Sequence, residues 1–214
     1  LEESVYDYNI RGWMLGMNRD YLTDAGTNNY FGFELGYDKL TNKANHNFFP
    51  GTNNGEFNGN INGMLWKSKG DGVRRKYDFE YDAANRLLRG DFEQNDNGSN
   101  WGYATVNYKV LMGNGTDPTS AYDANGNILQ MQQWGLKIAG SQQIDNLSYQ
   151  YIAGSNKLLR VDDLISGDNK LGDFTDKYAG ASDYGYDKNG NMVTDLNKRM
   201  NGPTGSDITS GGAI

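Results

Sequence analysis

The sequence predicts an all-β fold built from short antiparallel hairpins, and its composition and periodicity support this. The 214 residues include 29 glycines, 27 asparagines and 15 tyrosines, but only 3 prolines. Glycine and asparagine tolerate the positive φ angles of tight turns, and tyrosine is enriched in strands. Apolar residues with the 3.6-residue period of an amphipathic helix are scarce. We therefore expect many short aromatic strands joined by tight turns.

A loose repeat centred on tyrosine runs along the chain, and its spacing is irregular. Its members contain Tyr8, Tyr37, Tyr81, Tyr122, Tyr151 and Tyr186. Irregular spacing around a fixed core indicates one structural unit with loops of variable length. A lone hairpin is only marginally stable in water, so the hairpins are expected to stack side by side. The predicted result is one extended, curved or spiralling β-sheet.

The stretches "YDANGNIL" and "YDKNGNMV" show the turn of this repeat most clearly. Asn-Gly flanked by apolar residues is the strongest local signal for a hairpin, and it predicts a type I′ turn with positive φ at both residues. The preceding aspartate can accept hydrogen bonds from backbone N–H groups two residues further on. The residues to which we assign this structural role are Tyr81, Asp82, Tyr122, Asp123, Asn125, Gly126, Tyr151, Tyr186, Asp187, Asn189 and Gly190.

A calcium loop is the alternative interpretation of the same residues. Asp-x-Asn-x-Asn matches the first three ligand positions of an EF-hand, which also needs glycine at position 6 and glutamate at position 12. Position 6 is Ile128 or Met192 here, and position 12 is Trp134 or Lys198. The pattern therefore favours a turn, and we expect neither a metal nor a cofactor.

The chain is expected to form one repeat-containing domain over residues 1–214, as a fragment of a larger structure. Two stretches, about 41–63 and 95–120, interrupt the repeat and are predicted to be loop insertions. The stretch 201–214 is poor in apolar residues and is predicted to be an irregular tail.

Charge and residue usage exclude several classes of function. The net charge is −7, and this average field would repel a nucleic acid. The chain has no cysteine, which excludes disulfides and thiolate catalysis. His46 is the only histidine and lies in an asparagine-rich stretch without a nucleophile motif. No long apolar run occurs, so membrane insertion is not expected.

The repeats resemble a known family. The segments "YDYNIRGWM", "FEYDAANRLL", "YDANGNIL", "LSYQYIAGSNKLLRV" and "YDKNGNMV" are similar to the YD repeats of the Rhs family of bacterial surface and secreted proteins. The similarity extends from Tyr6 to Asp195. Each motif alone has low specificity, whereas the six tyrosine-centred repeats in order are fairly specific.

This resemblance implies a non-catalytic shell at the bacterial surface or in a secreted protein. In that family the shell encloses or carries a C-terminal polypeptide, often a toxin, so the expected partners are the rest of the shell and such a domain. The family's core usually ends in an Asp-Pro-x-Gly-type segment that supports self-cleavage. Asp117-Pro118 is followed here by Thr-Ser, so that cleavage segment is missing.

Two other functions remain as alternatives. Trp13, Trp66, Trp101 and Trp134 lie outside the Tyr-Asp motifs, and their flat rings could stack on sugars in a carbohydrate-binding module. Large aromatic side chains also cover sheet faces routinely, and this second role is favoured. A glycoside hydrolase would need two facing carboxylates, which the sequence does not identify among 27 acidic residues. Exposed sheet edges in such an array also predict edge-to-edge oligomers.

Overall fold

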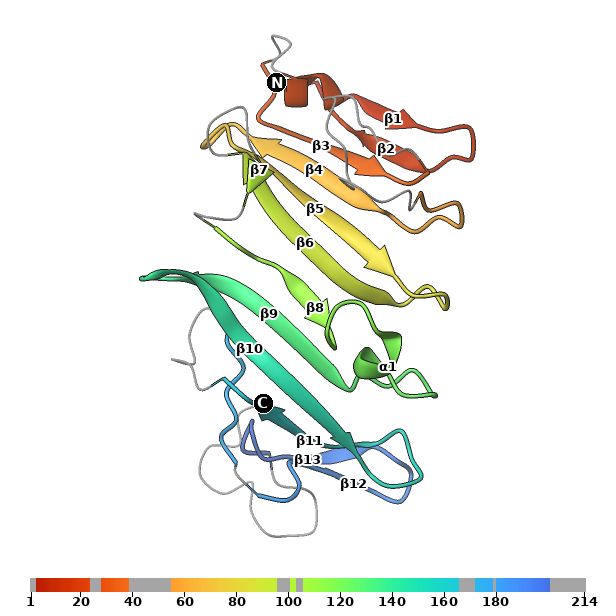
Figure 1. The fold of residues 1–214 in the computed structure, drawn as a ribbon, viewed down its shortest axis with the longest axis vertical. Helices are drawn as coiled ribbons and strands as arrows, with labels where there is room; N and C mark the ends of the chain where they lie inside the picture. Colours follow the sequence, from red (N-terminus) through yellow and green to blue (C-terminus); the bar gives the residue numbers. More distant parts are fainter. Residues whose placement is uncertain are drawn as a thin grey trace. The chain divides into compact units, whose positions relative to one another are not determined.

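The computed structural model describes residues 3–23, 28–38, 55–95, 101–102, 106–165, 172–178 and 180–200. Its secondary structure is nearly all antiparallel β-strand, with one 3₁₀ turn and one four-residue helix among these residues (Figure 1). This confirms the predicted all-β fold class. Within the described part of the chain, no helix has both the length and the apolar character needed to cross a membrane.

Eleven strands make up the larger sheet. Its hydrogen-bonded order is β1-β2-β3-β4-β5-β6-β8-β9-β10-β11, with β7 paired to β6, and β12 and β13 form a separate pair. The strands are β1 (Tyr6–Tyr8), β2 (Met14–Met17), β3 (Phe31–Gly36), β4 (Gly63–Ser68), β5 (Arg74–Tyr81), β6 (Leu87–Asn95), β7 (Trp101–Gly102), β8 (Val110–Met112), β9 (Gln130–Lys137), β10 (Gly140–Tyr151), β11 (Leu158–Asp163), β12 (Tyr184–Tyr186) and β13 (Met192–Asp195).

The chain divides into two compact units. Unit 1 comprises Leu1–Val110 with Gly135–Gln142, and unit 2 comprises Leu111–Trp134 with Gln143–Ile214. In unit 1, strands β1 to β6 follow one another in space as they do in sequence (Figure 1). Each of these strands therefore pairs with its sequence neighbour, as expected of hairpins added one after another.

Opposite faces of the unit 1 sheet carry different chemistry. Because side chains alternate along a strand, the register places Trp66, Tyr77 and Phe92 on one face. Ring centroids on this face lie 5.9 Å apart for Trp66 and Tyr77, and 5.4 Å apart for Tyr77 and Phe92. The opposite face carries Leu65 and Lys76, which are both buried. One face is thus an aromatic ladder and the other is largely ionic.

A short 3₁₀ turn covers part of the ionic face. η1 (Arg19–Thr23) lies against β3 and β4 and contributes the buried side chains of Tyr21 and Leu22. The Lys67 ammonium lies 4.6 Å from the centre of the Tyr21 ring, and Arg74 Nε donates to the Leu22 carbonyl at 2.6 Å. By packing against Lys67, η1 shields this charged strand residue from water.

In unit 2, Asp183 joins the β12–β13 pair to β11. Its backbone N–H donates to the Leu159 carbonyl, and its Oδ2 accepts from the Val161 N–H at 3.0 Å. Its carbonyl accepts from the N–H of Leu196 beyond β13. The fully buried Asp183 therefore completes backbone hydrogen bonding at a point where the strands no longer pair directly.

The predicted insertions are only partly visible. Residues 41–54 of the first stretch, which include His46, lie outside the described residues. The whole tail 201–214 also lies outside them. The described part of 95–120 contains β7, β8 and most of α1 (Pro118–Ala121). Asp117 caps this helix by accepting from Thr119 N–H at 2.9 Å, so Asp117-Pro118 begins a helical turn here.

Replacing Leu65 should measure how much the buried apolar side chains of the ionic face contribute to the stability of unit 1. The Leu65 side chain is 0% exposed, so Leu65→Ala leaves a cavity and should lower the free energy of unfolding by about 2–5 kcal/mol. Urea unfolding monitored by tryptophan fluorescence measures this. The control Ile138→Ala removes a fully exposed side chain and should change stability by less than about 0.5 kcal/mol. Equal effects of the two variants would contradict this assignment of the core.

Candidate functional site

The aspartate of the repeat organises the turn that follows it. Asp123 Oδ1 accepts hydrogen bonds from the N–H groups of Asn125 and Asn127 at 2.9 and 2.8 Å. Asp187 makes the same pair of bonds, to Asn189 and Asn191 at 2.9 and 2.8 Å. The carboxylates that could have been calcium ligands thus accept from backbone donors of their own turns.

The same arrangement recurs with other residues in two of the earlier repeats. Asp82 Oδ1 accepts from the N–H groups of Ala84 and Arg86, and Asn9 Oδ1 accepts from those of Arg11 and Trp13. The amide oxygen of Asn9 can replace the carboxylate because the turn needs only an acceptor at this point.

The predicted type I′ turn is wrong in its dihedral angles. Gly126 and Gly190 have φ values of 86° and 87°, whereas Asn125 and Asn189 are not among the residues with positive φ. Only one residue per turn is therefore left-handed, which is the pattern of a three-residue loop with a type I turn and a bulge. The Asp-to-backbone bonds favour this form, because they fix the residues before the glycine in the right-handed region. Asn85 takes the glycine position in its repeat, with φ of 62°.

Four of the repeat tyrosines donate a hydrogen bond to the hairpin before them. The acceptor is a backbone carbonyl at or near the first residue of the preceding hairpin's returning strand, and this contact occurs twice in each unit. The four hydroxyl-to-carbonyl pairs are Tyr37 to Met14 at 3.0 Å, Tyr81 to Ile61 at 2.8 Å, Tyr151 to Ile128 at 2.9 Å, and Tyr186 to Leu158 at 3.0 Å. We call this contact the tyrosine joint.

Asparagine side chains join neighbouring turns beside the tyrosine joint. Asn156 Oδ1 accepts from Asn125 Nδ2 at 3.1 Å and from Asn127 Nδ2 at 2.9 Å. In unit 1, Asn85 Oδ1 accepts from the side-chain amides of Asn58 and Asn60. The asparagine content of the chain is thus used between turns as well as within them.

Hydrogen bonding makes the turn aspartates stronger acids. The side-chain amide of Asn127, together with backbone N–H groups, holds the pKa of Asp123 below its ordinary value. The Asn191 amide and backbone donors lower the pKa of Asp187 in the same way. Because the ionised carboxylate is the form that accepts these bonds, the turns are suited to neutral pH.

The four tryptophans lie in separate surroundings. Trp13 packs on Tyr37 with 5.2 Å between ring centroids, and the Arg11 guanidinium lies 5.0 Å from its ring centre. Trp66 belongs to the aromatic ladder, and the Lys76 ammonium lies 5.6 Å from the centre of the Trp101 ring. Since Lys76 and Trp66 face opposite sides of the sheet, the structure does not bring Trp66 and Trp101 together. Trp134 is half-buried in β9.

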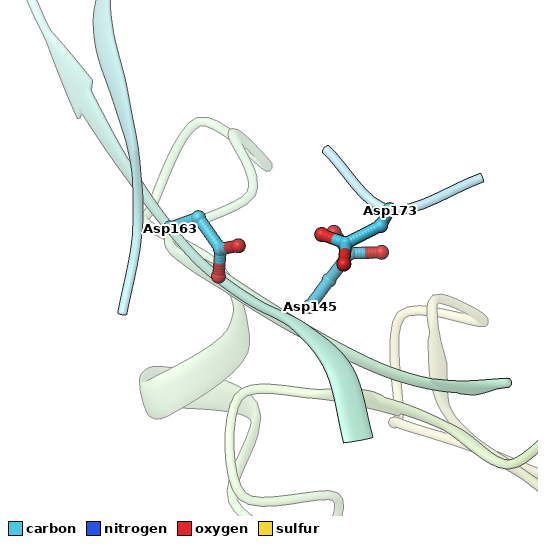
Figure 2. Close-up of side chains that lie close together, drawn as sticks. All are labelled: Asp145, Asp163 and Asp173. Carbon is cyan, nitrogen blue, oxygen red and sulfur yellow. The ribbon is translucent and has the colours of Figure 1, made fainter. Parts of the chain in front are cut away.

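Three aspartates converge in unit 2 (Figure 2). A carboxylate oxygen from each of Asp145, Asp163 and Asp173 lies within 4.8 Å of the others. Asp145 lies on β10, and Asp163 ends β11. Leu147 is opposite Asp163 in the register, so Asp145 lies two residues along β10 from the residue that pairs with Asp163. Asp173 comes from the segment 172–178, which is held to β10 by a 2.7 Å bond from the Phe174 N–H to Asp145 Oδ1.

This cluster offers oxygen ligands of the kind that Ca²⁺ and Mg²⁺ prefer, and among the described residues it is the group that could hold a metal ion. Two of its members also have a structural task. Asp163 Oδ1 accepts from the N–H groups of Asn146 and Ile165, both at 3.0 Å, and Asp145 fixes the 172–178 segment. The sequence prediction did not include this cluster, because its members come from three segments with no shared motif.

A second group of charges is buried on the ionic face of unit 1. Lys76 Nζ lies 2.5 Å from Asp78 Oδ2 and 2.8 Å from Glu93 Oε2. Burial raises the pKa of Asp78 to about 7, although the neighbouring Lys76 ammonium acts in the opposite direction. Acidic neighbours at Glu93 and Asp91 add to the increase in pKa. One lysine thus neutralises part of a carboxylate-rich stretch of the sheet.

Comparison with known proteins does not assign the chain to a family. No protein-family model matches it, and no curated protein matches it. The resemblance to YD repeats therefore rests on the motifs quoted above.

Substitution of Gly126 should separate the cost of positive φ from the cost of crowding. A Cβ atom at Gly126 would meet nothing within 4 Å, so a substitution there tests backbone conformation alone. Gly126→Val should destabilise the protein by about 1–3 kcal/mol, because a β-branched residue is strained at this φ. Gly126→Asn should cost much less, as Asn85 occupies the equivalent position. Thermal unfolding followed by circular dichroism measures both, and equal costs would contradict the assigned turn.

The raised pKa of Asp78 should make stability depend on pH. The folded state binds a proton at Asp78 between about pH 4 and pH 7, where the unfolded state has released it. The contribution of Asp78 to the free energy of unfolding should therefore fall as pH rises through this window. In urea unfolding at pH 4.5 and 7.5, Asp78→Asn should remove about 1 kcal/mol or more of that decline. The control Asp71→Asn, at an exposed carboxylate, should leave the decline in place.

Proposed function

We propose that this chain is a non-catalytic scaffold segment, in which stacked Tyr-Asp hairpins form part of a shell that encloses or displays another polypeptide at the bacterial surface or in a secreted protein. The tyrosine joint is the observation that carries this proposal. It occurs at four places with the same donor type and the same acceptor type. Repetition of one contact between neighbours is typical of arrays that grow by adding identical units.

The repeated polar residues favour a structural role, because their side chains make the hydrogen bonds of the turns and of the tyrosine joints. In the motifs that begin at Tyr81 and Tyr186, the following aspartate accepts from its own turn and the tyrosine hydroxyl donates to the neighbouring hairpin. A catalytic site, by contrast, gathers groups with different roles in one place.

The aromatic ladder of unit 1 supports contact with a polypeptide. Trp66, Tyr77 and Phe79 are half-buried, so this face keeps apolar surface available to another chain. Broad aromatic surface with polar edges is common where proteins bind one another. The enclosed polypeptide would therefore lie against this face.

Glycan binding by Trp13, Trp66, Trp101 and Trp134 is the weaker alternative. Three of these rings already pack on protein groups, namely Tyr37, Tyr77 and the Lys76 ammonium. A sugar would have to compete with these contacts for the ring faces. A glycan array is the direct test, and a tryptophan-dependent signal would favour this alternative over the scaffold.

Removal of the joint hydroxyls should weaken the array. Tyr81→Phe and Tyr151→Phe each delete one hydrogen bond to a backbone carbonyl and should lower the free energy of unfolding by about 0.5–1.5 kcal/mol. Tyr178→Phe is the matched control, since its side chain is exposed and it lies outside the motifs. Chemical denaturation measures all three. No difference between joint and control variants would remove the main support for the scaffold.

Limited proteolysis of the intact gene product tests enclosure itself. A polypeptide held by the hairpin array should resist cleavage while the array is folded, and should become accessible when Tyr81→Phe and Tyr151→Phe are combined with mild denaturant. The Tyr178→Phe protein should retain protection under the same conditions. A gene product without any polypeptide outside the array, or one that is cleaved equally in every variant, would refute this role.

A further inference from the structure

The buried charges on the ionic face of unit 1 form a reactive arrangement as well as an ion pair. Lys76 and Asp78 lie two residues apart on β5, so their side chains share one face, and they are only 2% and 6% exposed. Lys76 Nζ lies 2.5 Å from Asp78 Oδ2 and 2.8 Å from Oε2 of Glu93, its direct partner on β6. An amine, a carboxyl group and a second carboxylate able to act as a base thus meet at one nitrogen atom.

The surroundings of this group disfavour the ionised form of the Asp78 carboxyl. The Trp101 ring lies over the Lys76 ammonium, with 5.6 Å between the nitrogen and the ring centre, and helps to keep water away. Within the described part of the chain, the buried Asp78 Oδ1 accepts no hydrogen bond. Burial raises the pKa of Asp78 to about 7, so a large share of this carboxyl carries a proton at neutral pH. A protonated carboxyl is the form that an amine can attack.

We propose that Lys76 and Asp78 react with each other to form an amide bond between Nζ and Cγ, with Glu93 as the base and one water molecule as the leaving group. The product is a covalent ring within β5, which the protein makes from its own side chains. The inference does not depend on the tyrosine joint and goes beyond the proposed scaffold role.

The reaction balances without an oxidant, a reductant or a further reactant. Glu93 takes one proton from the Lys76 ammonium and passes it to the Asp78 carboxylate, which gives an amine and a carboxylic acid. The Nζ lone pair then forms the bond to Asp78 Cγ. The C–O bond to the Asp78 hydroxyl breaks, and this oxygen leaves as water with a second proton that Glu93 carries from Nζ. An ammonium and a carboxylate have become a neutral amide and water, and Glu93 is again ionised.

Burial favours the product of this reaction. In water, hydration of the ammonium and the carboxylate opposes amide formation, but buried ions have lost most of that hydration. Conversion of Lys76 and Asp78 to an amide removes both charges from the interior. The fixed geometry also replaces an encounter in solution, since well-oriented groups in one molecule react as though at effective concentrations of about 10⁵ M or more.

The bond should accumulate after folding rather than during it. Lys76 must release a proton before it can attack, although two carboxylates stabilise its charge. Freshly folded protein therefore retains the ion pair, and the pH dependence of stability described for Asp78 applies to this unreacted state. Aged protein should contain the amide.

Intact-mass spectrometry during incubation at neutral pH tests the proposal. The mass of the wild-type protein should fall by one water molecule, and trypsin should no longer cleave after Lys76. Asp78→Asn should lose ammonia instead of water and reach the same final mass as the wild type, because both form the same amide. Lys76→Arg keeps the positive charge but should show no loss. Wild-type protein held unfolded in urea should also keep its full mass.

Further controls separate this bond from other dehydration products. An aspartyl succinimide also has lost one water molecule, but hydroxylamine cleaves a succinimide and leaves an amide intact. Glu93→Gln should slow the reaction by about a hundredfold or more, as expected for loss of a base. Lys198→Arg is the matched control at an exposed ion pair, 3.7 Å from Asp195, and should lose water as the wild type does. Circular dichroism confirms that each variant is folded.

Three outcomes would overturn the inference. They are a wild-type mass that stays unchanged through a month of incubation, a loss of water that persists in Lys76→Arg, or fragment spectra that place the link between Lys76 and Glu93. None of these would remove the scaffold proposal, because the tyrosine joint variants test it by a different measurement.

Discussion

The hydrogen bond from repeat tyrosines such as Tyr81 and Tyr151 to a carbonyl of the preceding hairpin is the contact on which the rest of this structure depends. A hairpin can form from local sequence, but two strands bury too little surface to be stable alone. The tyrosine ring adds apolar contact with the neighbour, and its hydroxyl satisfies a carbonyl near the strand end. Both effects fix how far one hairpin is displaced along the next. Since alternate residues face opposite sides, that displacement decides which side chains form the aromatic ladder and which form the ionic face.

The strand register brings the charged side chains of the ionic face together, and these side chains restrict which substitutions the sheet can accept. Charged strand residues such as Lys76 and Asp78 are buried, so they need partners on the same face. Removing one partner from such a group is costly, because the remaining charge stays buried. The rings of the aromatic ladder are uncharged, so exchange of one ring for another leaves no buried charge without its partner. The two faces should therefore differ in how freely their sequences can vary.

Prediction from sequence succeeded where the determining contacts are local. The Tyr-Asp turns span six residues, and their aspartate, asparagine and glycine identify a hairpin without reference to the rest of the chain. The turn type was mistaken because Asn-Gly alone favours type I′, whereas the Asp123 bonds to backbone N–H groups favour a type I turn before Gly126. The acceptor of the tyrosine joint is a backbone carbonyl, which has no sequence signature. The Asp145, Asp163 and Asp173 cluster joins three segments through β-register, so no local pattern contains it.

The repeat containing Tyr37 carries the predicted insertion 41–63, yet Tyr81 still reaches the Ile61 carbonyl. Ile61 lies near the end of that insertion, so the joint uses the point where the extra sequence returns to the sheet. Such a design permits segments to be gained or exchanged at hairpin tips during evolution without disturbing the sheet. Genetic recombination could diversify the hairpin tips while the strands of the sheet remain unchanged.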